Sequence, residues 1–141
     1  MSETLILSVG LDPLILRARE AILRSEGYIV VSASSIKEAF LLFRDGDFDL
    51  MILCNTLPVM DRERLTCLIR ASGSRIPIAS ISSMPWERRV FPDATVDENP
   101  VELAVGIRRM LAKRFELAAL GASSPVRAGA STRALHATVR A

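Results

Sequence analysis

Short apolar segments alternate with amphipathic segments along most of the chain. Runs rich in Leu, Ile and Val predict five buried strands, over residues 4–9, 28–33, 50–55, 76–82 and 94–96. Most of the segments between them repeat apolar residues at steps of three and four, which predicts helices. Successive parallel strands need a crossover connection, usually a helix, and such crossovers are right-handed. The pattern therefore predicts an α/β fold: a single domain with a doubly wound, five-stranded parallel sheet in the order 2-1-3-4-5.

Capping residues mark several of the expected helix ends. Asp12 followed by Pro13 predicts the start of the first helix, and Gly27 predicts its end. Ser35 with Glu38 has the spacing of a capping box at the start of the second helix. Residues 83–92 contain two prolines, so only a short fourth helix is predicted there.

The four longer expected helices each have an apolar stripe. The stripes comprise Leu14, Ala18, Ala21, Ile22 and Ser25 in the first helix; Ile36, Ala39, Phe40 and Phe43 in the second; Leu65, Leu68 and Ile69 in the third, expected from about Asp61 to Ala71; and Leu103, Ala104, Ile107, Met110 and Leu111 in the last, which begins at Pro100.

The composition is that of a globular protein, with 50% hydrophobic and 24% charged residues. The apolar runs are well short of the roughly 20 residues that cross a bilayer, and no leader pattern is seen. We therefore expect a cytoplasmic protein that does not contact membranes. Cys54 and Cys67 form neither a disulfide framework nor a zinc pattern, so we expect free thiols, no metal site and no cofactor.

Charge and composition divide the chain near residue 118. Residues 1–116 carry 15 basic and 16 acidic residues, a net charge of −1, and the three later arginines make the whole chain +2. From about Gly121 the sequence is rich in Ala, Ser, Gly, Thr and Arg, and it has too little apolar surface to offset the entropy of ordering. We expect a domain over residues 1–118 and a disordered basic tail over 119–141. Three spread arginines are too sparse to predict nucleic acid as a partner.

Ligands of doubly wound sheets bind outside the carboxyl ends of the strands, where the strand order reverses. In this chain that point lies between the first and third strands. The residues expected there are Gly10, Leu11, Cys54, Ser82 and the segment after Val96. A thiol cannot replace a carboxylate as a ligand for a hard cation such as Mg²⁺.

Over about residues 3–115 the chain resembles the receiver domain of bacterial response regulators. The resemblance is carried by LSVGLDPLI (7–15), the segment 49–61, IPIASISS (76–83) and NPVEL (99–103). It implies a flavodoxin-like fold and a role in two-component signal transduction or a phosphorelay. In the family, an acidic pair after the first strand and an aspartate at the end of the third hold magnesium. A hydroxyl after the fourth strand and a lysine after the fifth respond to the phosphoryl group.

Matching these segments places the acidic pair of the family at Gly10 and Leu11, the phosphoacceptor at Cys54 and the switch hydroxyl at Ser82. The resemblance therefore implies that three carboxylates are missing. The lysine position falls within residues 96–98, where no lysine occurs.

Two further departures concern the charge around the expected site. Asp97 and Glu98 place acids where the family has its lysine, and Arg62 replaces the family's glycine after its Met-Asp pair. The loop after the third strand is therefore expected to have a different shape.

These departures lead to the hypothesis of a degenerate pseudo-receiver: a non-enzymatic signalling or scaffolding module that acts by protein–protein contact, independently of aspartyl phosphorylation. The resemblance places the contact, a homodimer among the options, on the face of the fourth and fifth helical segments and the last strand. Two alternatives stay open. One is a thiol redox sensor that uses Cys54, and the other is a small-ligand site in the space that the acidic pair vacates.

Each candidate residue also has a simpler structural explanation. Asp12 is better explained as a helix cap than as a surviving acid. Ser82 most often would satisfy backbone groups, and Cys54 most often would be a small buried apolar side chain. Trp86 either anchors a partner or covers the edge of the sheet, and the sequence favours neither.

Overall fold

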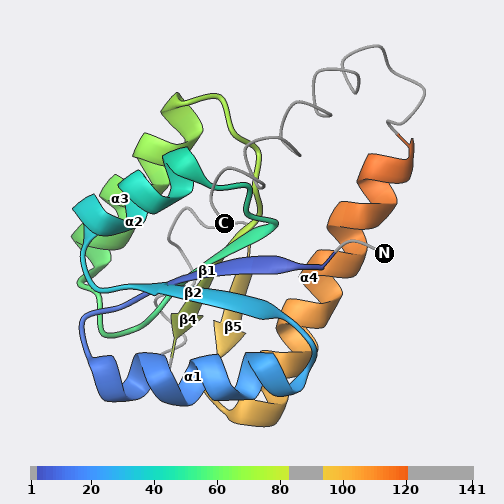
Figure 1. Cartoon of the computed structure of the whole chain (residues 1–141), viewed down its shortest axis with the longest axis horizontal. Coiled ribbons are helices and arrows are strands. Elements are labelled where there is room, and N and C mark those ends of the chain that lie inside the picture. The colour runs from blue at the N-terminus through green and yellow to red at the C-terminus, as the bar shows by residue number, and fades with distance from the viewer. Residues whose placement is uncertain (1–2, 83–93, 121–141) are drawn as a thin grey trace.

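Five parallel strands form one sheet in the order β2-β1-β3-β4-β5. The computed structural model describes residues 3–82 and 94–120 (Figure 1). The strands are β1 (Leu5–Val9), β2 (Ile29–Ala33), β3 (Leu50–Leu53), β4 (Ile78–Ser82) and β5 (Ala94–Asp97). The predicted α/β class, single doubly wound sheet and strand order are confirmed. Trp86, the short fourth helix and the tail beyond residue 120 lie outside the described residues.

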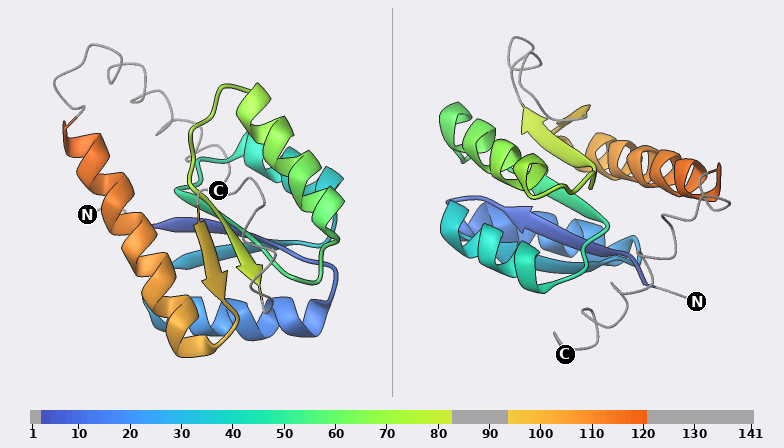
Figure 2. Two further views of the ribbon diagram at one scale, coloured as in Figure 1. Left: turned by 180° about the vertical axis from the view of Figure 1, so that it is seen from behind. Right: turned by 90° about the horizontal axis from the view of Figure 1, so that it is seen from above.

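Two helices cover each face of the sheet, an arrangement that can be followed in Figures 1 and 2. The helices α1 (Pro13–Ser25) and α4 (Pro100–Leu120) pack on one face, and α2 (Ile36–Asp45) and α3 (Val59–Ala71) pack on the other. α4 is the last helix predicted from the sequence, and it extends past the expected domain end at residue 118.

The sheet separates two apolar cores, because alternate residues of a strand point to opposite faces. Leu7 and Leu53 belong to the core under α2 and α3, whereas Ile6 and Ile52 belong to the core under α1 and α4. β1 and β3 are buried along their whole length, as expected for central parallel strands covered on both sides. Polar chemistry can therefore gather only at the ends of these strands.

The predicted caps of the first two helices are present. The Asp12 carboxylate accepts hydrogen bonds from the backbone N–H groups of Leu14 at 2.9 Å and Ile15 at 3.4 Å. Gly27 adopts a positive φ of 95° after α1. The Glu38 N–H donates to Ser35 Oγ at 3.0 Å, as in a capping box. Asp12 is thus a cap, and it starts α1 directly after the β1 loop.

The predicted inward face of α1 is wrong. Leu14 is 72% exposed, whereas Leu16, Arg19 and Leu23 are buried against the sheet. On the inward face, the polar residues Arg19 and Glu20 lie between Leu16 and Leu23. A prediction based on the number of apolar residues therefore favoured the opposite side of the helix. The same error affects Leu68 of α3, which is 40% exposed while Arg62 and Thr66 are buried. The predicted stripe of the last helix is confirmed.

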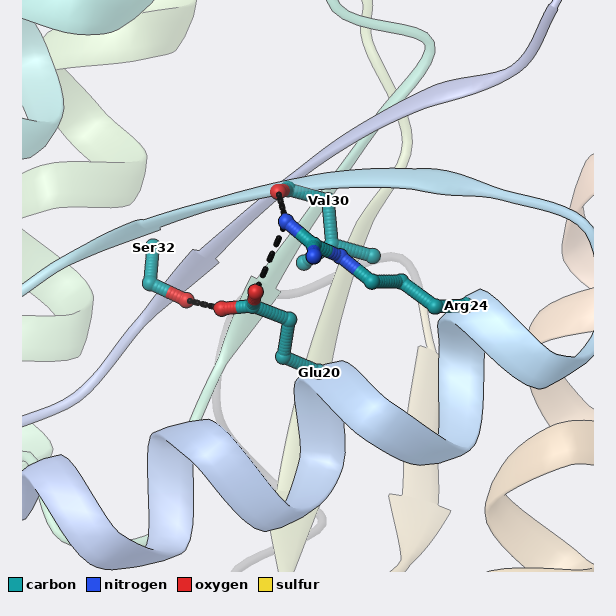
Figure 3. Close-up of polar contacts among 4 residues, drawn as sticks. All are labelled: Glu20, Arg24, Val30 and Ser32. Atoms are coloured by element: carbon teal, nitrogen blue, oxygen red, sulfur yellow. Dashed lines mark hydrogen bonds and ion pairs between the residues drawn. The ribbon is translucent and has the colours of Figure 1, made fainter.

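Glu20 belongs to a polar cluster between α1 and the edge strand β2 (Figure 3). Ser32 Oγ donates to Glu20 Oε1 at 2.9 Å, and Arg24 Nη2 lies 2.8 Å from Glu20 Oε2. Arg24 also donates to the Val30 carbonyl at 3.3 Å. Because the neighbouring Ile29 N–H bonds to the Thr4 carbonyl beside β1, the Val30 carbonyl faces the open edge. Arg24 thus covers an acceptor that another strand could pair with.

The C-terminal end of α1 is tied to α4. Arg108 Nη2 lies 2.6 Å from Glu26 Oε1, and this hydrogen bond raises the pKa of Arg108. Burial raises the pKa of the nearby Tyr28, which packs at the border of the same core. Among the described helices none is long and apolar enough to cross a membrane.

Candidate functional site

The loops that follow β1, β3 and β5 meet at the carboxyl edge of the sheet. The Cys54 N–H donates to the Val9 carbonyl at 2.8 Å, and the Gly10 N–H donates to the Ala33 carbonyl at 3.1 Å. These bonds continue the sheet by one residue beyond β1 and β3. The structure therefore brings Gly10 and Cys54 together at the predicted switch point.

Gly10 is required by close packing. A Cβ at this position would lie 2.8 Å from Thr56 Oγ1 and 2.9 Å from Cys54 Cβ, which is closer than side chains pack. The space that an acidic side chain would need is thus filled by Thr56 and Cys54. The same packing argues against a small-ligand pocket beside Gly10.

Leu11 lies at the surface and is 48% exposed. Its backbone N–H donates to Thr56 Oγ1 at 3.0 Å. Thr56 thus joins the loop after β1 to the loop after β3. The hydroxyl of Thr56 holds these two loops close together, and it is a site residue that the sequence pattern did not reveal.

Cys54 is fully buried, in the core under α1 and α4. Its Sγ lies 3.9 Å from Ser8 Oγ, at the outer limit of a hydrogen bond to sulfur. Cys54 is therefore the small buried apolar side chain that its strand position suggested, and the second thiol, Cys67, is exposed. Ser82 ends β4 and is paired with Asp97 of β5.

A chain of side-chain hydrogen bonds crosses the carboxyl edge of the sheet. Arg19 Nη1 of α1 donates to Asn55 Oδ1 at 3.0 Å, and Asn55 Nδ2 donates to Glu98 Oε1 at 2.9 Å. Arg19 is only 8% exposed. Asn55 directly follows Cys54, and Glu98 directly follows β5. Glu98 was noted from the sequence, but Arg19 and Asn55 were not. The available signal for Asn55 was a polar residue just after a buried strand. Arg19 lies within α1, and no sequence signal distinguished it from the other arginines of that helix.

Glu98 is carried by a well-bonded turn. The Asp97 carboxylate accepts from the Asn99 N–H at 2.8 Å. The Asn99 side chain in turn caps α4, accepting from the N–H groups of Val101 at 2.9 Å and Glu102 at 3.3 Å. The backbone on both sides of Glu98 is thus held by local hydrogen bonds.

Arg62 is buried on the other face of the sheet, with 2% exposure. Its Nε donates to the Leu57 carbonyl at 3.0 Å, and its Nη1 donates to Ser80 Oγ of β4 at 2.9 Å. The guanidinium group therefore joins the loop after β3 to the neighbouring strand. A glycine at this position could make neither hydrogen bond, and the expected change in loop shape stays a prediction.

The residues at the edge do not fit a magnesium ion. Magnesium prefers oxygen ligands in octahedral geometry, whereas the three positions matched to the family's carboxylates hold a glycine, an exposed leucine and a buried thiol. Within residues 3–82 and 94–120, no three or more His, Cys, Asp or Glu side chains gather in a way that could hold a metal ion.

Comparison with curated proteins found a relative among plant signalling proteins. The chain is 31% identical over 94 residues to the two-component response regulator ARR22 of Arabidopsis thaliana. The match covers 63% of this chain and 66% of the relative, just under two thirds of its length. No protein-family model matches the chain.

Solved structures share the fold over nearly their whole length. The response regulator TrrA of Thermotoga maritima, solved in complex with Mg²⁺-BeF, is 25% identical with a TM-score of 0.68, covering 75% of this chain and 97% of TrrA. The receiver domain of a sensor histidine kinase of Pseudomonas aeruginosa, with magnesium coordinated in its active site cleft, is 25% identical with a TM-score of 0.68, covering 79% and 99%. A putative response regulator of Chloroflexus aurantiacus is 22% identical with a TM-score of 0.70, covering 79% and 99%. The chain thus has the CheY-like fold of these structures. The relative and the two structures at 25% identity support the interpretation of this fold as a response regulator receiver domain.

Proposed function

We propose that this receiver-type chain is a non-enzymatic signalling or scaffolding module that acts by protein–protein contact, without phosphorylation of an aspartate. The observation that carries the proposal is the packing at the carboxyl edge of the sheet. Gly10, Leu11 and Cys54 stand where the family has carboxylates, and the side chains of Thr56 and Cys54 fill the space beside Gly10.

Phosphoryl transfer depends almost entirely on positioning and on neutralising charge on the transferred oxygens. Two of the similar structures contain magnesium, in one case with BeF and in the other in the active site cleft. In this chain the residues at the matched positions supply no carboxylate oxygen. Glu98 adds a negative charge where the family has its lysine, and that charge would repel a phosphoryl group. Both features oppose the transfer.

The central test is incubation with acetyl phosphate and Mg²⁺ followed by intact-mass measurement. We expect no phosphoryl group on the folded protein, because the residues at the edge neither bind the metal nor neutralise the phosphoryl oxygens. TrrA of Thermotoga maritima, treated in parallel, tests whether the conditions support phosphorylation of a receiver. A stable added phosphoryl group on this chain, lost on hydroxylamine treatment as an acyl phosphate would be, would refute the proposal.

The partner is proposed to be another protein, with a homodimer as one form, and the setting is proposed to be the cytoplasm. The contact face proposed from the resemblance includes β5 and α4. The outer surface of α4 exposes Arg109 and Lys113, and the exposed Arg108 is paired with Glu26 at the end of α1. A non-enzymatic module of this kind would pass its signal by the shape and charge of such a surface.

The structure disfavours the alternative of a thiol redox sensor, because a reactive thiol needs access to solvent. With iodoacetamide near neutral pH, we expect the exposed Cys67 to react readily and the buried Cys54 to react only when the protein unfolds. Peptide mapping by mass spectrometry separates the two sites, and Cys67→Ser leaves Cys54 as the only thiol. If Cys54 in that variant reacted as fast as in urea-unfolded protein, the redox hypothesis would regain its basis.

A further inference from the structure

We propose that Arg19, Asn55 and Glu98 form a permanent latch that holds the loop after β5 against the end of β3 in a single conformation. This inference rests on the proposed function, because it supplies the means by which the module keeps one shape without phosphorylation. In the receiver family that the chain resembles, a lysine after the fifth strand responds to the phosphoryl group. Here Glu98, from the same segment, is already hydrogen-bonded to the residue after Cys54.

The direction of the hydrogen bonds determines which residues can form the latch. A guanidinium group has only donors, so the Asn55 amide presents its oxygen to Arg19. The amide nitrogen then faces residue 98, which must offer an acceptor. The Glu98 carboxylate does so, whereas a lysine at position 98 would meet a second donor. The acid at position 98 is therefore matched to this amide.

Both ends of the latch are fixed to regular structure. Arg19 lies on the inward face of α1 and is largely buried, so its guanidinium group has little freedom to swing away. Glu98 stands between Asp97 and Asn99, whose side chains bond the backbone of the turn and the start of α4. Both bonds include a charged group, which strengthens a hydrogen bond. The Arg19–Asn55 bond is partly buried and the Asn55–Glu98 bond lies at the surface, so the first is expected to contribute more. The two hydrogen bonds that close the latch are both made within the chain.

The Asn55→Asp substitution tests the latch with little change in shape. A carboxylate at residue 55 still accepts from Arg19, but it places a second negative charge against Glu98 in place of the amide donor. We expect the backbone amides of residues 97–99, 101 and 102 to exchange with deuterium roughly fivefold faster than in the wild type, as measured by hydrogen-exchange mass spectrometry or NMR. The amides of β1 serve as the internal reference and are expected to keep their rates.

The double variant Asn55→Asp with Glu98→Gln is the decisive comparison. The glutamine introduced at position 98 can donate to the aspartate introduced at position 55, so the amide and the carboxylate have exchanged places. The latch is therefore expected to close again, with exchange within about twofold of the wild type. Glu102→Gln is the matched control, since it removes one exposed acid from the first turn of α4 without touching the latch, and its loop is expected to exchange like the wild type.

Three results would overturn the latch: unchanged exchange in Asn55→Asp, a double variant as fast as the single variant, or an equal acceleration in β1 that reveals general destabilisation. The acetyl phosphate test on the same wild-type protein separates this failure from that of the proposed function. If the loop amides do not exchange as expected and no phosphoryl group is added, the latch is refuted and the proposed function is retained. If a phosphoryl group is added, the proposed function is refuted whatever the exchange rates of the loop amides are.

Discussion

Replacing Gly10 by aspartate is expected to lower the free energy of unfolding by about 3–5 kcal/mol. The new Cβ would lie 2.8 Å from Thr56 Oγ1 and 2.9 Å from Cys54 Cβ, so the end of β3 or the loop after it must move. The new carboxylate would also lose water beside a buried thiol, which adds the cost of burying a charge. Urea denaturation followed by circular dichroism measures the change.

Leu11→Asp is the matched control, because it introduces the same acid one residue later, at a residue that is 48% exposed. We expect it to change the free energy of unfolding by less than about 1 kcal/mol. Equal urea midpoints for the two variants would show that the close approach at Gly10 is absent in solution. A large difference would mean that the acidic pair cannot be restored by substitution at these two positions alone.

The fold could be predicted from the sequence because its main signals are local. Apolar runs of strand length, amphipathic segments between them, and caps such as Asp12 and Gly27 depend on residues close together in the chain. The parallel order then follows from the need for crossovers. The strand ends were predicted less well: β3 ends at Leu53 instead of Asn55. Cys54 keeps one hydrogen bond of the sheet pattern, to Val9, and Asn55 turns into the loop at the site.

The inward face of α1 could not be predicted, because its polar residues are satisfied by partners far away in sequence. Arg19 reaches Asn55, and Glu20 accepts from Ser32. A pattern of apolar residues cannot distinguish an arginine that faces water from one that is buried with a hydrogen-bond partner. The site could likewise be predicted only in part. The topology predicted Gly10 and Cys54 at the switch point, whereas the role of Asn55 could be recognised only from its contacts with Arg19 and Glu98.

The apolar pattern of α3 could not reveal that Arg62 is buried, as it could not for Arg19 in α1. Replacing Arg62 is expected to have the second large effect on the free energy of unfolding. Arg62→Met is expected to lower the free energy of unfolding by about 2–4 kcal/mol. Methionine has a similar length and is apolar, so the core keeps most of its packing. The Leu57 carbonyl and the Ser80 hydroxyl, however, lose the donors that they have in the wild type. Buried polar atoms without partners account for most of the expected cost.

Arg64→Met provides the control for Arg62→Met, because Arg64 lies on the exposed side of the same helix. It removes the same charge, and we expect a change within about 0.5 kcal/mol. Thermal and urea unfolding of both variants, with the wild type, measure the difference. If both variants unfolded like the wild type, the guanidinium group would contribute nothing to stability and would not hold the loop after β3. If only Arg62→Met is destabilised, Arg62 is a structural link between that loop and β4, and the carboxyl edge of the sheet is held from α3 as well as from α1.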